Sequence, residues 1–392
     1  MKPTKPTQRV AAVDVLRALT MTLMLFVNDF AGIPGIPHWL KHAEMTEDML
    51  GFSDIIFPAF IFCMGMSVVL AIDSRYRKGD TPLQVIAHMF WRTVALVTMG
   101  LFSLNSGGVA GISHSWFMVL MVIGFFLIWG VYPRYDDWRR HAVTALKAAG
   151  VLLLAFLIIY KDIHGRPFHT GWWGILGLIG WTYAVCAVIY LFARDNYRAC
   201  LIVWGVLVLL SLGSHSEIIP YDYASRVVLL TFIPSDWTLH AIGFSGIVTI
   251  LTIRRYKSNP RRLLGLLVSA GVVMLVCGIV AHNYWIVSKI QATPTYLFYN
   301  LAMFLPVSGI LYWLCDIRGH ADWFAFIRPA GTATLTCYLI PYIWYAVMQI
   351  AGWSYPAVLN FGYPGLLRSA VFAIVVVAIT GVMAKAGIKL KV

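Results

Sequence analysis

Charged side chains are scarce in this chain of 392 residues: Asp, Glu, Lys and Arg make up 12% of it, and hydrophobic residues make up 60%. A soluble domain carries about 25% charged residues, and half that share cannot cover a surface that faces water. The shortage excludes a cytosolic enzyme and a disordered protein. The mean hydropathy of +0.76 indicates that lipid surrounds most of the chain.

Cysteine is also rare, and none of the six cysteines stands in a C-x-x-C pair. All six lie in or beside apolar stretches, so we interpret them as small buried hydrophobic residues, which excludes a disulfide scaffold. Two histidines, His164 and His169, share one loop, but they lack the i, i+4 helical spacing that is typical of metal ligands. We therefore expect no bound metal.

Apolar runs are what the chain has in abundance, and a helical span needs about 20 such residues. We predict an all-α polytopic membrane bundle of about 10–12 transmembrane helices, with residues 1–392 forming one domain and residues 12–72 carrying the motif region. The shortest run is the seventh, and an amphipathic stretch at 218–234 follows it. The twelve runs cover residues 12–30, 52–72, 86–104, 115–132, 142–160, 172–192, 199–213, 237–254, 262–282, 295–315, 330–350 and 366–387.

Basic residues are concentrated in every second loop of this arrangement. If the N-terminus is cytoplasmic, 21 of the 30 Lys and Arg residues fall on the inside and five fall outside, as the positive-inside rule requires. We therefore predict that both termini are cytoplasmic and that the first span is not cleaved. The net charge of +13 then reflects basic residues in cytoplasmic loops, and we expect membrane lipid, but no nucleic acid, as a partner.

The first span begins and ends with polar residues. Asp14 and Arg17 share a helix face at its inner end, where they can form a structural ion pair, or Arg17 can hold an anionic ligand. Asn28 and Asp29 close its outer end. Asp73 and Asp316, at other inner ends, are expected to be paired charges.

A histidine and a carboxylate flank the start of the second span. His42 lies in the preceding loop, and Asp54 lies just inside the span, where an unpaired acid would be costly. His42 beside Asp54 would make a base with an orienting carboxylate. Alternatively, Asp54 caps the helix or pairs with Arg or Lys.

The stretch VDVLRALTMTLMLFVND…KHAE…FSDIIFPAFIFCMGMS resembles the opening of the heparan-α-glucosaminide N-acetyltransferase family. Three further segments resemble that family: WWGILGLIGWTYAV, SKIQATPTYLFYNLAMFLPVSGILYWLCDIRG and RPAGTATLTCYLIPYIW. Two departures stand out. The family's G-V-L-Q-R motif is replaced by the sequence from His114 to Leu120, and Ala333 or Thr334 replaces an asparagine.

The resemblance implies transfer of an acetyl group from cytoplasmic acetyl-CoA to an amino sugar or glycan, such as a heparan sulfate-like chain, across the plasma membrane. His42 matches the family's active-site histidine and Asn28 its asparagine, and we add Asp54 as the third catalytic residue. Arg17, Arg92 and Asp14 are candidates for binding acetyl-CoA. The candidates for binding the acceptor are Asp29, Lys289 and His114.

The chemistry of acyl transfer fits these residues but leaves its route open. His42 can act as a base towards the acceptor or can carry the acetyl group covalently. Asn28 can donate to the developing oxyanion. The acceptor can be an amine or, in an envelope polysaccharide, a hydroxyl. A secondary transporter and a relative that has lost catalysis are the alternatives, and a homodimer is a further expectation.

Overall fold

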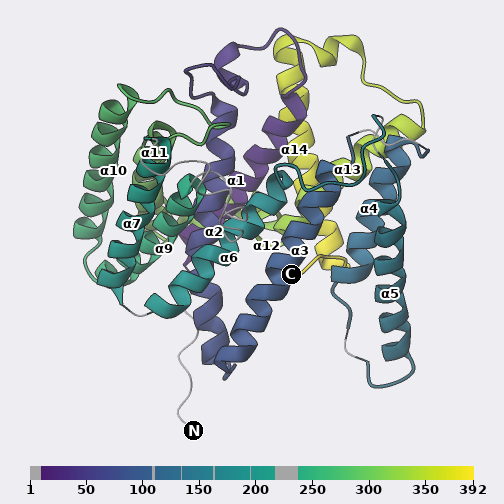
Figure 1. Cartoon of the computed structure of the whole chain (residues 1–392), viewed down its shortest axis with the longest axis horizontal. Coiled ribbons are helices and arrows are strands. Elements are labelled where there is room, and N and C mark those ends of the chain that lie inside the picture. Colours follow the sequence, from purple (N-terminus) through teal and green to yellow (C-terminus); the bar gives the residue numbers. More distant parts are fainter. Residues whose placement is uncertain (1–9, 108–110, 134, 162–163, 195, 217–236) are drawn as a thin grey trace. The chain divides into compact units, whose positions relative to one another are not determined.

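The computed structural model describes residues 10–107, 111–133, 135–161, 164–194, 196–216 and 237–392 (Figure 1). The stretch 218–234 and the first basic residues of the chain lie outside these ranges. Within them the fold is all-α, and the extended pairing is limited to one isolated bridge between Gly130 and Leu390. The α-helices are α1 (Ala11–Phe30), α2 (Phe52–Arg77), α3 (Pro82–Leu104), α4 (His114–Trp129), α5 (Arg139–Ile158), α6 (Gly174–Ala193), α7 (Tyr197–His215), α9 (Thr238–Tyr256), α10 (Pro260–His282), α11 (Pro294–Tyr312), α12 (Arg328–Thr332), α13 (Thr334–Ile350) and α14 (Gly362–Lys385).

Eleven of the twelve apolar runs each coincide with one helix of this series, and the run 330–350 overlaps α12 and α13, so the predicted class of fold is confirmed. Nine helices among the described residues are long and apolar enough to cross a membrane, and a tenth span is formed if two bent segments count as one. Those two segments, His320–Thr332 and Thr334–Ile350, meet at 72°. The protein is a multi-pass membrane protein, and the cytoplasmic position of its termini stays a prediction.

Two of the predicted spans are not among the helices counted here, and each has a physical reason. Helix α4 has only 16 residues, which is less than a bilayer core requires. Helix α9 is less apolar than its neighbours and is buried along most of its length, including Ser245 and Thr249. By contrast, most apolar side chains of α5 and α10 are exposed, and most of those of α7 are exposed or half-buried, which a lipid environment stabilises.

Helix starts follow local capping rules. The side-chain oxygen of Asn196 accepts from the Ala199 amide at 3.0 Å, and that of Asn259 accepts from the Arg262 amide at 3.1 Å. Thr293 begins α11 in the same way, directly before Pro294. These side chains satisfy amides that have no partner inside a helix.

The start of α1 is capped from far along the chain. Both carboxylate oxygens of Asp316 accept hydrogen bonds, from the backbone amides of Ala11 and Ala12, at 2.8 Å each. The carboxylate of Asp316 therefore caps a helix, and the expectation that it is also a paired charge stays a prediction. Asp73 is paired as expected: Arg194 lies 3.2 Å from it, and Arg254 forms a second ion pair.

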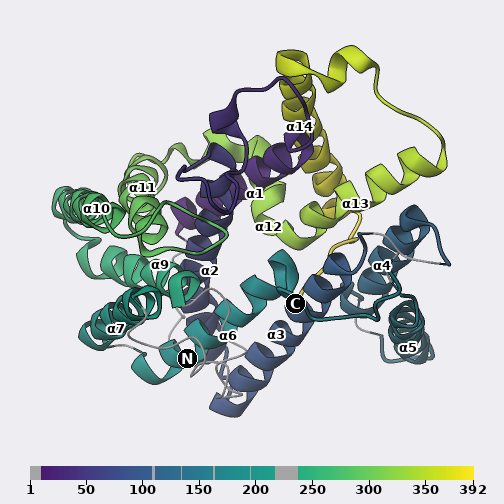
Figure 2. The ribbon, with the colours of Figure 1, turned by 45° about the horizontal axis from the view of Figure 1, so that its top comes forward.

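The chain divides into two compact units, so the prediction of a single domain over residues 1–392 stays a prediction. The first unit comprises Met1–Thr20, Pro37–Phe90 and Trp181–Arg328, and the second comprises Met21–Ile36, Trp91–Gly180 and Pro329–Val392. In the first unit α7, α9, α10 and α11 lie side by side, and in the second α4 and α5 form an antiparallel pair (Figures 1 and 2).

Candidate functional site

The loop that carries His42 is held tightly against the start of α2 in the first unit. Ser53 donates to the carbonyl oxygen of Leu40 at 2.5 Å. Gly51 precedes the helix, and a Cβ atom at this position would lie 2.0 Å from the carbonyl oxygen of Lys41. Only glycine allows this close approach, so the sequence fixes the path of the loop beside α2.

This path brings His42 and Asp54 into contact. The Nδ1 atom of His42 lies 2.7 Å from Oδ1 of Asp54, and the amide of Ala43 donates to Oδ2 at 2.9 Å. The Asp54 side chain is 1% exposed and that of His42 is 40% exposed. In a neutral imidazole whose Nδ1 donates to this carboxylate, Nε2 carries the lone pair. Among the described residues Nε2 has no hydrogen-bond partner.

A lysine from a distant segment completes this group. The Nζ atom of Lys289 lies 3.2 Å from Nδ1 of His42 and 3.6 Å from Oδ1 of Asp54. Burial lowers the pKa of the Lys289 ammonium below its usual range, and the Asp54 carboxylate counteracts part of this shift. Tyr296 donates its hydroxyl to the backbone carbonyl of Asp54 at 2.8 Å. Asp54 thus contacts both a histidine and a lysine, and its role as the orienting carboxylate of a base stays a prediction.

The same distant segment clamps the outer part of the loop. Asp48 accepts from the amide of Val287 at 2.8 Å and pairs with Nε2 of His282 at 2.8 Å. The hydrogen bond from Val287 is the main reason that the pKa of Asp48 lies below its usual range. Gln291 donates to the carbonyl oxygen of Met45 at 2.8 Å. The loop is thus fixed on both sides of His42.

The candidates for binding acetyl-CoA lie in two different units. Asp14 and Arg17 belong to the first unit, 3.7 Å apart, and Arg17 also donates to the Ser67 hydroxyl at 3.0 Å. The pairing on one helix face is therefore observed. Arg92 is a half-buried residue of α3 in the second unit. A role of these residues in binding the donor stays a prediction.

Asp29 lies in a buried ion-pair network of the second unit. Its carboxylate accepts from Arg368 at 2.8 Å and from the Ser369 hydroxyl at 2.5 Å, and Tyr345 donates to its other oxygen. The Asp29 side chain is 1% exposed. The pairing with Arg368 gives it a structural role, and the predicted contact with the acceptor stays a prediction.

The two remaining candidates also belong to the second unit. Asn28 is exposed at the end of α1. His114 begins α4, and its Nδ1 donates to the carbonyl oxygen of Ser106. The predicted cooperation of Asn28 with His42, and the contact of His114 with the acceptor, stay predictions.

Sequence reasoning did not anticipate His282, Tyr296 or the Asp48 clamp. These contacts join positions more than 230 residues apart, and no local pattern encodes such pairs. The segment from Ser288 onwards, which matched a family motif, was the available signal.

Within the described residues no three His, Cys, Asp or Glu side chains gather where a metal could be held. Five of the six cysteines are buried, and Cys277 is half-buried.

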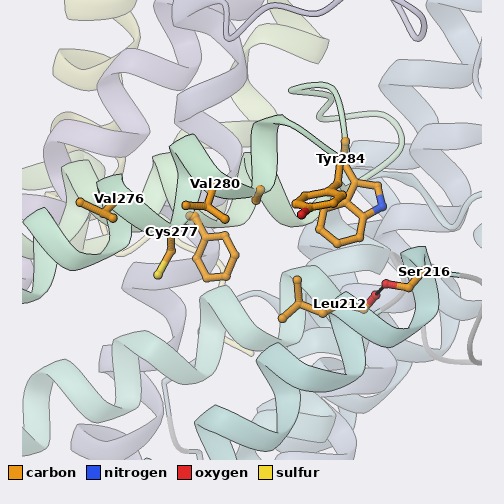
Figure 3. Close-up of a pocket in the computed structure, with 9 residues that line it drawn as sticks. Leu212, Ser216, Val276, Cys277, Val280 and Tyr284 are labelled. Carbon is orange, nitrogen blue, oxygen red and sulfur yellow. Dashed lines mark hydrogen bonds between the residues drawn. The ribbon is translucent and has the colours of Figure 1, made fainter.

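A pocket of about 640 Å³ lies between α7, α10 and α11 (Figure 3). Leu212, Val276, Val280 and Tyr284 make its walls apolar, and none of the predicted site residues lines it. It does not contain the histidine–carboxylate pair, and no histidine, carboxylate, lysine or arginine lines it.

Fold and site together define an all-α, multi-pass membrane protein with a histidine–carboxylate–lysine group beside the start of one span. A family profile described as a domain of unknown function, DUF5009, matches residues 9–238. The chain therefore belongs to the DUF5009 family.

Comparison with curated proteins gives a more distant relationship. The chain is 33% identical over 98 residues to the heparan-alpha-glucosaminide N-acetyltransferase of Mus musculus, and 32% identical over 98 residues to that of Homo sapiens. Each match covers 25% of this chain and 14% of the enzyme. The chain thus matches only a small part of its relatives' length. The resemblance seen in the sequence is confirmed as a distant relationship.

Proposed function

We propose that the protein is a membrane acetyltransferase that uses acetyl-CoA as donor and acetylates an amino sugar or glycan. The observation that carries the proposal is the His42–Asp54 contact, which orients the imidazole and leaves Nε2 free. The distant relationship to a membrane acetyltransferase supports it. The plasma membrane, with the histidine on the extracytoplasmic side, is the proposed location.

In the proposed reaction the nitrogen of the acceptor amine attacks the thioester carbon of acetyl-CoA. At the same time Nε2 of His42 takes a proton from this amine. The C–N bond forms, the C–S bond breaks, and the CoA thiolate leaves and takes up a proton. Asp54 stabilises the imidazolium that forms in this step. In the alternative route, Nε2 itself attacks the thioester and an acetyl-histidine passes the group to the acceptor. Asn28 is the proposed oxyanion donor.

The test is release of free CoA by the purified protein, with glucosamine as the acceptor and with buffer alone. We expect His42→Ala to abolish release that depends on the acceptor. His38→Ala is the matched control, because His38 is an exposed histidine of the same loop and pairs with Glu47. Full activity of His42→Ala would overturn the assignment. If wild-type protein releases no CoA with glucosamine, a polysaccharide hydroxyl acceptor is tested next. Inactivity there too would contradict the proposal.

A further inference from the structure

A second cavity, of about 360 Å³, lies in the first unit between α7, α9, α10 and α11. This volume is within the range of about 300–1,000 Å³ that is typical of ligand pockets. One side is formed by aliphatic and thioether side chains from three helices. They include Leu201, Leu266, Ala270, Val273, Met274 and Leu305.

The opposite side is the polar face of α9, but its hydroxyl protons are already used. Ser245 donates to the carbonyl of Ile242 at 2.6 Å, and Thr249 donates to the carbonyl of Ser245 at 2.8 Å. Thr252 donates in the same way to Val248. No charged side chain lines the cavity. The interior therefore suits an apolar chain better than a sugar or a charged ligand.

At one end of the cavity lie two tyrosines, and an arginine guanidinium lies over the ring of each. The guanidinium of Arg255 lies 5.2 Å from the ring centre of Tyr197, and that of Arg262 lies 5.1 Å from the ring centre of Tyr256. Both tyrosines line the cavity. Stacking on a ring holds a guanidinium in place and leaves its charge unneutralised.

Positive charge is concentrated at this end. The sequence from Arg254 to Arg262 contains five basic residues and no acidic one. Asp73 pairs with Arg254. Arg255, Lys257, Arg261 and Arg262 are exposed and have no carboxylate partner among the described residues.

An apolar cavity with free cations at its mouth matches a molecule with an acyl chain and an anionic head. We propose that this cavity binds an anionic phospholipid, with one acyl chain between α7 and α10 and the phosphate at Arg255 and Arg262. Basic pockets between membrane helices bind anionic lipid head groups in this manner. The proposal does not depend on the acetyltransferase function.

The experiment compares lipid binding to the delipidated protein by native mass spectrometry, with phosphatidylglycerol and phosphatidylcholine as probes. We expect at least tenfold tighter binding of phosphatidylglycerol, and loss of this preference in R255Q/R262Q. The matched control R139Q/R140Q removes two exposed arginines at the start of α5 and should keep the preference. Raising the salt concentration should weaken the binding.

A second variant tests whether the acyl chain binds inside the cavity, and it leaves every charged residue unchanged. Ala270→Phe places a ring in the cavity and should reduce phosphatidylglycerol binding at least fivefold while the protein keeps its elution volume. Equal binding of the two lipids to wild-type protein would overturn the proposal. So would equal losses in R255Q/R262Q and R139Q/R140Q. Displacement of phosphatidylglycerol by acetyl-CoA would identify the cavity as a donor site and would also overturn it.

Discussion

At the scale of single residues, His42 combines two properties that a general base needs. One ring nitrogen is fixed by a buried carboxylate, and the side chain is still 40% exposed. Lys289 stands beside both groups, so the buried negative charge is balanced within the site. Replacing Asp54 by asparagine removes the charge of this carboxylate with little change in the shape of the side chain.

We predict that Asp54→Asn lowers turnover by a factor on the order of 10²–10⁴. The amide keeps the volume of the side chain, but it cannot stabilise an imidazolium and favours the wrong tautomer of His42. The measurement is the rate of CoA release at saturating acceptor. Asp80→Asn is the control. Asp80 follows the C-terminal end of α2, far from His42 in the sequence, and pairs with Arg75 of that helix. Unchanged turnover in Asp54→Asn would remove the carboxylate from the mechanism.

The site residues show what a sequence can and cannot predict. His42 and Asp54 are 12 positions apart, and the cost of an acid at the start of a span was enough to expect a partner in the preceding loop. Lys289 was predicted to bind the acceptor, but its contact with His42, which spans 247 positions, was not anticipated. The pairing of Asp29 with Arg368 was missed for the same reason, because such contacts depend on how distant helices pack.

At the scale of elements, the loop before α2 depends on Asp48 for its attachment. The pKa of Asp48 is depressed in the folded protein, chiefly by the hydrogen bond from Val287. An unfolded aspartate binds its proton near pH 4. The stabilisation from Asp48 is therefore fully present above this pH and is lost as the pH falls through the lower pKa of the folded state.

We predict that Asp48→Asn makes this loop insensitive to acid in that window. In wild-type protein, hydrogen exchange at residues 44–50 should rise as the pH falls below about 4, after correction for the intrinsic exchange rate. In Asp48→Asn the exchange should already be raised at neutral pH. Glu44→Gln changes another carboxyl of the same loop and should behave like wild type. An equal acid response in Asp48→Asn would contradict this role.

Helix α9 packs against α2 at two glycines. A Cβ atom at Gly65 would lie 1.7 Å from the carbonyl oxygen of Gly243, and one at Gly246 would lie 2.1 Å from that of Phe62. These backbones can approach so closely only because both positions lack side chains, as small residues allow in membrane bundles.

Gly65→Ala should therefore lower the free energy of unfolding by about 1–3 kcal/mol, since the helices must move apart. Gly205→Ala is the matched control, because nothing lies within 4 Å of a Cβ atom there. In that half-buried but uncrowded position alanine favours the helix by about 0.5–1 kcal/mol. Thermal unfolding of both variants in one detergent measures the difference. A higher midpoint for Gly65→Ala would show that the close packing is not required.

At the scale of the whole molecule, hydrophobic periodicity and length predicted the class of fold, since every apolar run became a helix. The number of spans was harder to predict, because α9 owes its burial to protein rather than lipid. Periodicity cannot distinguish these two environments. The division into two units also lies beyond local patterns, because each unit collects three separate segments of the chain.

The charge distribution gives a topology prediction. In a cysteine-free background, His38→Cys should react with a membrane-impermeant maleimide on intact cells. Lys78→Cys, at the far end of α2, should react only after the membrane is permeabilised. These outcomes follow from cytoplasmic termini and an outer loop that carries His42. The reverse pattern of labelling would invert the whole arrangement.

The cap on α1 also bears on how the protein is made. The ribosome releases α1 long before it reaches Asp316, yet the amides of Ala11 and Ala12 donate to this carboxylate. During synthesis the N-terminal end of α1 must therefore stay hydrated or bind another partner. This end of α1 therefore reaches these hydrogen bonds only after the segment that follows α11 has been translated.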